Sequence, residues 1–148
     1  MTLEIRDARP EDEAEWRRLW AGFIIFYKVT VPDDVTDATW RRILDPASAL
    51  FMRVAVMDGR VVGFAISLLH EATWVKEPVC YLEDLFVDDT LRGIGIGRAL
   101  IDDLVDQAKA KGWSRLYWHT DEDNATARKL YDTYTKSDGH VRYRISFP

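Results

Sequence analysis

Three glycines and two arginines stand close together in the middle of the chain, directly before a segment with helical spacing. This segment reads Arg92-Gly93-Ile94-Gly95-Ile96-Gly97-Arg98. A helix that begins after a glycine-rich turn presents several unpaired backbone N–H groups at the positive end of its dipole. Glycines let that backbone approach an anion closely, and the two guanidinium groups add positive charge. The segment therefore predicts a binding site for a phosphate-bearing ligand.

Two common phosphate-binding motifs do not fit this segment. A dinucleotide fold uses GxGxxG, but the sixth position is Arg98 when counted from Gly93 and Leu100 when counted from Gly95. The P-loop pattern GxxxxGK[ST] does not occur in the chain. The pattern that fits is [RQ]xxGxG, which is filled by Arg92, Gly95 and Gly97.

Glu83 and Asp84 are adjacent carboxylates in an otherwise apolar run, Val79–Val87. Because side chains alternate along a strand, the two point to opposite faces and do not share a proton as a pair. An unpaired buried carboxylate is costly, so each needs a partner or must line a wet cleft. We expect Glu83 to orient an amine or relay its proton through water, and Asp84 to bind a cationic substrate or a backbone amide. Hydrogen bonds that support the fold are the alternative for both.

Apolar periodicity and turn residues indicate the elements that must position these side chains. Alternating or continuous apolar runs predict strands over residues 3–9, 51–57, 60–69, 79–87, 115–120 and 141–147. Helical spacing predicts helices that begin near residues 10, 36 and 124, and one over residues 95–111. Asp58-Gly59 predicts an antiparallel hairpin, and the strand, helix and strand over residues 79–120 predict a right-handed parallel crossover. The fold class is therefore α/β, with a mixed sheet flanked by helices.

Length and composition limit the classes of protein that fit. The chain has 148 residues and no repeated or linker-like segment, so we expect a single domain over residues 1–148. A formal net charge of −5 disfavours general binding to nucleic acid or anionic membranes. There is no signal-peptide pattern and no apolar run of about 18 residues, the length of a membrane span. The one cysteine, Cys80, allows neither an internal disulfide nor a CxxC zinc site, so we expect a cytoplasmic protein without a metal.

Four segments, taken in order, resemble the GNAT acetyltransferase superfamily. They are Ile5–Asp12 (IRDARPED), Leu82–Val87 (LEDLFV), Arg92–Gly97 (RGIGIG) and Asn124–Tyr131 (NATARKLY). They match the family's first strand and helix start, its central strand, its pyrophosphate loop and its NxxAxxLY helix. The second segment is most similar to diamine (spermidine/spermine-type) acetyltransferases and to a yeast histone and polyamine acetyltransferase subgroup. The chain departs from the family at Gly139-His140, where Gly-Phe is usual.

The resemblance implies a GNAT fold, with a mostly antiparallel mixed sheet and the parallel crossover at an acyl-CoA site. It implies an acetyl-CoA-dependent N-acetyltransferase that binds the cofactor through the backbone of Leu85, Phe86 and Val87, the loop 92–98 and Asn124. Because helix caps need the same residue type, a cap is the alternative for Asn124. Tyr131 would contact the acyl-CoA and donate a proton to the leaving thiolate, with a core aromatic as the alternative. Glu83 is the implied catalytic carboxylate.

The acceptor side is expected at the first two helices. Trp20 and Tyr27 supply aromatic faces that can bind an alkylammonium beside Glu83 and Asp84. We expect a small primary amine, such as a polyamine, diamine or amino acid, to attack the thioester directly. The alternatives are a protein or peptide amine as acceptor, a CoA-binding sensor without turnover, and a protein-interaction module. The C-terminal strand and the resemblance favour a homodimer or a tetramer.

Overall fold

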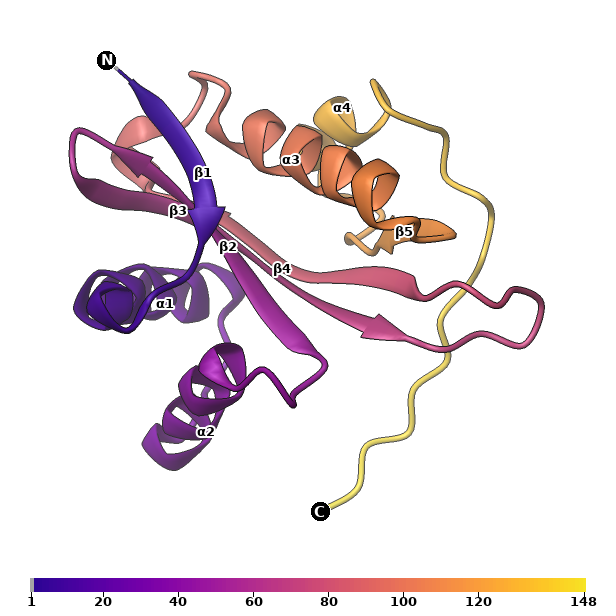
Figure 1. Cartoon of the computed structure of the whole chain (residues 1–148), viewed down its shortest axis with the longest axis horizontal. Helices are drawn as coiled ribbons and strands as arrows, with labels where there is room; N and C mark the ends of the chain where they lie inside the picture. The colour runs from indigo at the N-terminus through magenta and orange to yellow at the C-terminus, as the bar shows by residue number, and fades with distance from the viewer. Residues whose placement is uncertain (1) are drawn as a thin grey trace.

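The computed structural model describes residues 2–148 and contains one five-stranded sheet with the strand order β1-β2-β3-β4-β5 (Figure 1). The strands are β1 (Leu3–Asp7), β2 (Leu50–Met57), β3 (Arg60–His70), β4 (Val79–Val87) and β5 (Arg115–Trp118). The first three neighbouring pairs are antiparallel, and β4 and β5 are parallel. The mixed sheet and the parallel crossover predicted from the sequence are confirmed.

Four helices cover the two faces of this sheet. They are α1 (Glu13–Tyr27), α2 (Asp33–Leu44), α3 (Ile96–Lys111) and α4 (Ala125–Tyr131). Helices α1 and α2 lie on one face, whereas α3 and α4 lie on the other (Figure 1). Helix α2 begins at Asp33, earlier than predicted, because Pro32 precedes it and two aspartates suit the positive end of its dipole. Among residues 2–148, no helix is both long and apolar enough to cross a bilayer.

Each face of the sheet has its own buried core. On the α1 and α2 side, Trp16 is fully buried, and its ring stacks 5.2 Å from the rings of both Trp20 and Trp40. On the α3 side, the fully buried Leu100, Ile101 and Leu104 face apolar side chains of β2, β3 and β4. With its two faces packed in this way, the sheet is a rigid support for the residues at its edge.

The pairing of β4 changes at Glu83. Leu82 lies opposite Ser67 of β3, but Asp84 lies opposite Ile66, so Glu83 is an extra residue in a β-bulge. On its other side, β4 pairs with β5 only from Val79 to Leu82. The second half of β4 therefore has a strand neighbour on one side only.

The strand predicted over residues 141–147 is wrong for this structure. Residues 135–148 form neither helix nor strand; they pass beside β5, cross the β3–β4 hairpin in the view of Figure 1 and end below it. The alternation of apolar and polar residues that suggested a strand is present, but a strand also requires a hydrogen-bonded neighbour. Residues 141–148 make no backbone hydrogen bond to the rest of the described chain.

Candidate active site

The glycine-rich loop leads from β4 into α3 and leaves open space above its backbone. Gly93 and Gly95 have φ of 82° and 94°, in the left-handed region that favours glycine. A Cβ atom on either residue would meet no other atom within 4 Å. Because α3 begins at Ile96, the N–H groups of its first turn lie at this open backbone. The loop therefore fits the phosphate site predicted from the sequence, and a pyrophosphate group suits it.

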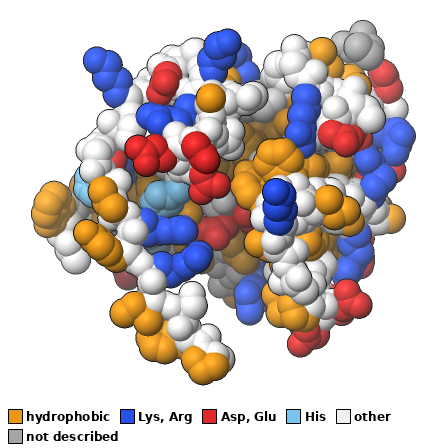
Figure 2. Space-filling model, turned by 180° about the vertical axis from the view of Figure 1, so that it is seen from behind, with side chains coloured by type: hydrophobic (Ala, Val, Ile, Leu, Met, Phe, Trp, Pro, Cys, Tyr) orange, Lys and Arg blue, Asp and Glu red, His pale blue; other side chains and the backbone are white. Residues whose placement is uncertain are grey.

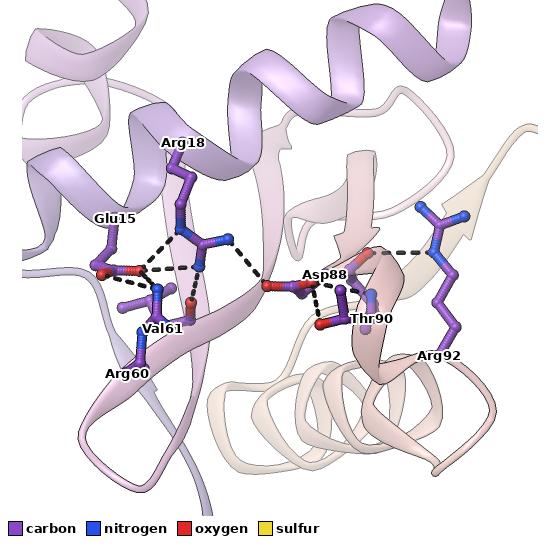
Figure 3. A network of polar contacts seen from close by, with 8 residues as sticks. Glu15, Arg18, Arg60, Val61, Asp88, Thr90 and Arg92 are labelled. Atoms are coloured by element: carbon purple, nitrogen blue, oxygen red, sulfur yellow. Dashed lines mark hydrogen bonds and ion pairs between the residues drawn. The ribbon is translucent and has the colours of Figure 1, made fainter.

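Polar contacts hold the start of this loop against α1 (Figure 3). The Asp88 carboxylate accepts hydrogen bonds from the backbone N–H and hydroxyl of Thr90, at 3.0 and 2.8 Å. Arg18 of α1 donates to the other oxygen of Asp88 at 2.9 Å and to Glu15 at the same distance. Burial alone would raise the pKa of Asp88, but the hydrogen bonds from Thr90 and from Arg18 outweigh it and lower that pKa. Asp88 thus stays ionised and fixes the loop to the helix.

The two arginines of the loop rest on aromatic rings. The guanidinium of Arg92 lies 5.1 Å from the ring centroids of both Phe26 and Phe86. Its Nε donates to the backbone oxygen of Val87 at 3.3 Å. Arg98 extends to the other side, where it donates to the Thr133 hydroxyl at 3.3 Å. Both positive charges are therefore held at the ends of the open loop.

The part of β4 without a β5 neighbour contains three of the predicted cofactor-binding residues. Phe86 belongs to the core on the α1 side, whereas Leu85 and Val87 pack on the α3 side. Asn124 caps α4, since its side-chain oxygen accepts a hydrogen bond from the backbone N–H of Ala127 at 3.2 Å. The capping role is thus confirmed. Contacts of these residues with a cofactor stay a prediction.

Tyr131 lies at the last turn of α4, against β5. Its ring meets the ring of Trp118 edge to face, with centroids 5.4 Å apart. Its hydroxyl makes no hydrogen bond to another described residue. Burial, with a contribution from Tyr27, raises the pKa of the Tyr131 phenol. The phenol is therefore protonated at neutral pH, as a proton donor must be.

The two carboxylates of β4 differ in their surroundings. Glu83 is exposed, whereas Asp84 is half-buried. Burial, aided by the charge of Glu83, raises the pKa of Asp84 to about 7. Asp84 in turn contributes to the raised pKa of Tyr27, whose main cause is burial. Tyr27 of α1 thus lies within electrostatic range of both Asp84 of β4 and Tyr131 of α4.

Trp20, which was expected to contact the acceptor amine, lies instead in the core on the α1 side. It is 8% exposed and stacks against Phe23 as well as Trp16. Its indole N–H donates to the hydroxyl of Thr36 at 3.1 Å. Helical spacing identifies the apolar stripe of α1 but does not tell which of its turns lies near Asp84. Tyr27, two turns later and 44% exposed, is the aromatic that the structure brings to the site.

A second aromatic group, on β4 and β5, was not predicted from the sequence. The rings of Tyr81 and Tyr117 stack with centroids 4.9 Å apart. Tyr117 donates to Nε2 of His70 at 2.9 Å, since Nδ1 of that ring is 2.7 Å from a backbone oxygen and must donate. The Tyr81 hydroxyl is 3.0 Å from Nδ1 of His119. Burial and the charge of Glu83 raise the pKa of Tyr81 to about 12.

This group forms a wall beside the carboxylates. Its pattern is visible in the sequence, because residues two apart along a strand share one face. Tyr81 therefore shares a face with Glu83, and Tyr117 shares a face with His119 on the neighbouring strand. Figure 2 shows the opposite side of the molecule from Figure 1, where histidine, basic and acidic side chains lie beside hydrophobic ones around a hollow. Aromatic faces and carboxylates together are suited to a cationic ligand.

The chain's one cysteine and its possible metal ligands are the remaining side chains with reactive chemistry. Cys80 is fully buried, and burial raises the pKa of its thiol to about 11, as expected for a core residue. Within residues 2–148, no group of three His, Cys, Asp or Glu side chains could hold a metal ion.

Comparison with known proteins gives consistent matches. The family model described as "Acetyltransferase (GNAT) family" matches residues 12–134. A D-amino-acid N-acetyltransferase of Saccharomyces cerevisiae is 33% identical over 144 residues, which cover 96% of this chain and 89% of that protein.

Solved structures match the fold over its whole length. A ribosomal-protein-alanine N-acetyltransferase of Brucella melitensis has a TM-score of 0.82 at 26% identity and covers 99% of this chain and 100% of its own. The structure of AAC(6')-Iy in complex with the bisubstrate analogue CoA-S-monomethyl-acetylneamine has a TM-score of 0.81 at 24% identity, with 100% of both chains covered. The GNAT fold expected from the sequence is confirmed.

The raised pKa of Asp84 leads to a prediction about stability. An acid whose pKa rises from 3.8 in the unfolded chain to about 7 in the fold destabilises the folded state above pH 4, and fully so above pH 7. Asp84→Asn should therefore raise the free energy of unfolding at pH 8 by about 2–4 kcal/mol, and this gain should vanish below pH 4.

Chemical denaturation at the two pH values measures this difference. The matched control is Glu83→Gln, since the neighbouring carboxylate is exposed and its replacement should leave stability nearly unchanged. An Asp84→Asn protein that is no more stable than the wild type at pH 8 contradicts the prediction.

Proposed function

Because the chain belongs to the acetyltransferase (GNAT) family and is an N-acetyltransferase, we propose that it transfers the acetyl group of acetyl-CoA to a small primary amine. The observation that carries this proposal is the meeting of Asp84, Glu83 and the Tyr81–Tyr117 stack at the point where β4 and β5 diverge. An amine that approaches there meets carboxylates and aromatic faces, while the glycine loop lies at the end of the same strand. Candidate acceptors are polyamines, diamines, amino acids and related metabolites.

The family uses acetyl-CoA, and the residues present suit it. We propose that the N–H groups at the start of α3, with Arg92 and Arg98, bind the pyrophosphate. The half of β4 beyond Leu82 has no β5 neighbour, so Leu85 to Val87 can offer backbone hydrogen bonds to the pantetheine arm, and we propose that Asn124 at the start of α4 contributes as well. These contacts hold the thioester between the diverging strands, within reach of the amine.

An alkylammonium must lose a proton before it can attack, because its pKa is about 10.4 in water. A general base works best when its pKa is close to the pH of the reaction. We propose that Asp84, with a pKa of about 7, accepts the proton, and that Glu83 orients the amine directly or through water. Tyr27 and the Tyr81–Tyr117 stack flank the ammonium group before transfer.

The leaving thiolate needs a proton in turn. Tyr131 has a protonated phenol and no hydrogen-bond partner among the described residues, so its hydroxyl is free to donate to the sulfur. The neutral amine attacks the carbonyl carbon, and the C–S bond breaks as Tyr131 gives its proton to the thiolate. The nitrogen of the new amide loses its second proton to water. Asp84 then releases to solvent the proton that it accepted, and the Tyr131 phenolate is reprotonated from solvent.

The relatives support a small amine more than a protein amine. The yeast relative, which covers 96% of this chain at 33% identity, carries the name of a D-amino-acid N-acetyltransferase. A neighbour with the bisubstrate analogue CoA-S-monomethyl-acetylneamine bound shares the fold. A protein amine is the second candidate, since the Brucella neighbour is a ribosomal-protein-alanine N-acetyltransferase. We also propose a cytoplasmic enzyme that works as a homodimer, or as a tetramer of two such dimers.

A thiol-release assay with acetyl-CoA and a panel of amines tests the proposal. The panel contains polyamines, diamines, D- and L-amino acids, aminoglycosides and a lysine peptide. We expect turnover with one class of small amine and little with the peptide. Turnover with the peptide alone supports the second candidate, and acetyl-CoA binding without turnover of any amine supports a sensor. Absence of acetyl-CoA binding contradicts the assignment of the loop.

Tyr131→Phe removes the hydroxyl and keeps the ring against Trp118. We expect kcat to fall about 100-fold, because the leaving thiolate loses its proton donor. The dissociation constant of acetyl-CoA, measured by calorimetry, should stay unchanged. The matched control is Tyr134→Phe. The Tyr134 hydroxyl donates to Asp102 of α3, away from the point where β4 and β5 diverge, so its loss should leave kcat near that of the wild type. An unchanged kcat for Tyr131→Phe removes this residue from the mechanism.

The pH dependence of kcat/KM separates the roles of the two carboxylates. In the wild type, kcat/KM should fall as the pH drops below about 7, because Asp84 becomes protonated and can no longer accept a proton. Asp84→Asn should lower kcat/KM and abolish this fall at low pH. Glu83→Gln should raise KM for the amine and keep the fall at low pH. If Glu83→Gln abolishes the fall instead, Glu83 is the base.

A further inference from the structure

Two side chains stand at the point where β4 and β5 diverge, one on each strand. The last pair of the β4–β5 ladder is Leu82 with Trp118, so Glu83 and His119 are the first residues beyond it. Both are exposed. Glu83 is also the extra residue of the β-bulge, so its backbone has no regular partner on β3 either. The carboxylate proposed to orient the amine is therefore carried by a residue whose strand pairing is incomplete.

Tyr81, two residues earlier in β4, is held on all sides. Its backbone is paired with Leu68 of β3 and with Tyr117 of β5. Its ring stacks on the ring of Tyr117 at 4.9 Å and meets the ring of His119 edge to face at 5.3 Å. The Tyr81 hydroxyl is thus a fixed group beside two residues whose own strands have just parted.

This hydroxyl has two partners and a single proton. Burial raises the pKa of Tyr81, and Glu83 adds to the rise through its charge and through a hydrogen bond. An ionised carboxylate can only accept, so the hydroxyl proton is directed to Glu83. Nδ1 of His119 lies 3.0 Å from the same hydroxyl oxygen. It must then carry a proton and donate it to Tyr81.

The neighbouring tyrosine has the opposite arrangement. Tyr117 donates its proton to Nε2 of His70, because Nδ1 of that ring donates to the backbone oxygen of Glu71. Its hydroxyl therefore has no proton left for Glu83. Of the two stacked rings, only that of Tyr81 has a hydroxyl that can restrain the carboxylate.

We infer that Tyr81 is a positioning residue: its hydroxyl accepts a hydrogen bond from His119, donates one to Glu83 and so fixes the Glu83 carboxylate for the incoming amine. The inference rests on the role of Glu83 in the proposed function. A glutamate side chain loses much rotamer freedom when it holds a ligand. Because Tyr81 restrains this side chain beforehand, less of that loss accompanies the binding of the amine.

Tyr81→Phe removes the hydroxyl and keeps the stacked ring. With the amine that the panel shows to be turned over fastest, we expect KM for the amine to rise about 10-fold, since a hydrogen bond to a charged group is lost. The value of kcat should change much less, and KM for acetyl-CoA should not change. The matched control is Tyr134→Phe, which removes a hydroxyl that donates to another carboxylate, that of Asp102, and should leave all three constants unchanged.

A double variant tells whether Tyr81 acts through Glu83. In Tyr81→Phe/Glu83→Ala, KM for the amine should equal that of Glu83→Ala alone, because the hydroxyl has no carboxylate left to position. Two effects that multiply contradict the inference, since Tyr81 then acts on the amine by another route. An unchanged KM for Tyr81→Phe contradicts it as well. Circular dichroism and acetyl-CoA binding check that the variants fold.

The protonation of His119 gives a reading that requires no turnover. NMR of ¹⁵N-labelled protein at pH 8 should show a proton on Nδ1 of His119, and Tyr81→Phe should change this signal but not that of His70. His119→Asn keeps an N–H donor near the position of Nδ1, so KM for the amine should rise less than in His119→Leu. A wild-type His119 protonated only at Nε2 contradicts the inference. Absence of turnover with every amine contradicts the proposed function instead, and the NMR signal then still decides whether these hydrogen bonds exist.

Discussion

Beyond Leu82, β4 keeps a strand neighbour on one side only, because β5 ends at Trp118. Backbone N–H and C=O groups that lose a neighbour still need hydrogen-bond partners, so this half of the strand is suited to an extended ligand. The bulge at Glu83 places two carboxylates at the point of divergence. The glycine loop lies at the end of the strand, α1 on one face and α4 on the other (Figure 1). The elements of the proposed site are thus organised around one interruption of sheet pairing.

Charge separates the two ends of this opening. The loop end carries Arg92 and Arg98 with the positive end of the α3 dipole, which suits an anionic cofactor. The end that we propose for the amine carries Glu83 and Asp84 with aromatic rings, which suits a cation. Because Arg92 rests between Phe26 and Phe86, its charge is kept at the loop end of α1. Two substrates of opposite charge can therefore occupy neighbouring sites without competing for the same groups.

Sequence reasoning succeeded where a local pattern determines the structure. The strand over residues 79–87 and the helix ending at Lys111 follow from apolar runs and from Gly112, and their order requires the crossover. It failed where the outcome depends on distant partners. Alternation predicted a strand at residues 141–147, but no other strand of the same chain lies beside it. Helical spacing could not tell that Trp20 faces the core while Tyr27 lies near Asp84. The stack of Tyr81 on Tyr117 could not be predicted either, because it depends on the register of β4 with β5.

The burial of Cys80 has a practical consequence for enzymology. It is the chain's one cysteine, it is fully buried, and its thiol has a pKa of about 11, so little of it is thiolate at neutral pH. Disulfide reagents attack thiolates that they can reach, and the folded protein offers none among its described residues. A colorimetric reading of free thiol thus carries no background from the protein itself, and single cysteines can be introduced for labelling without first removing the native one.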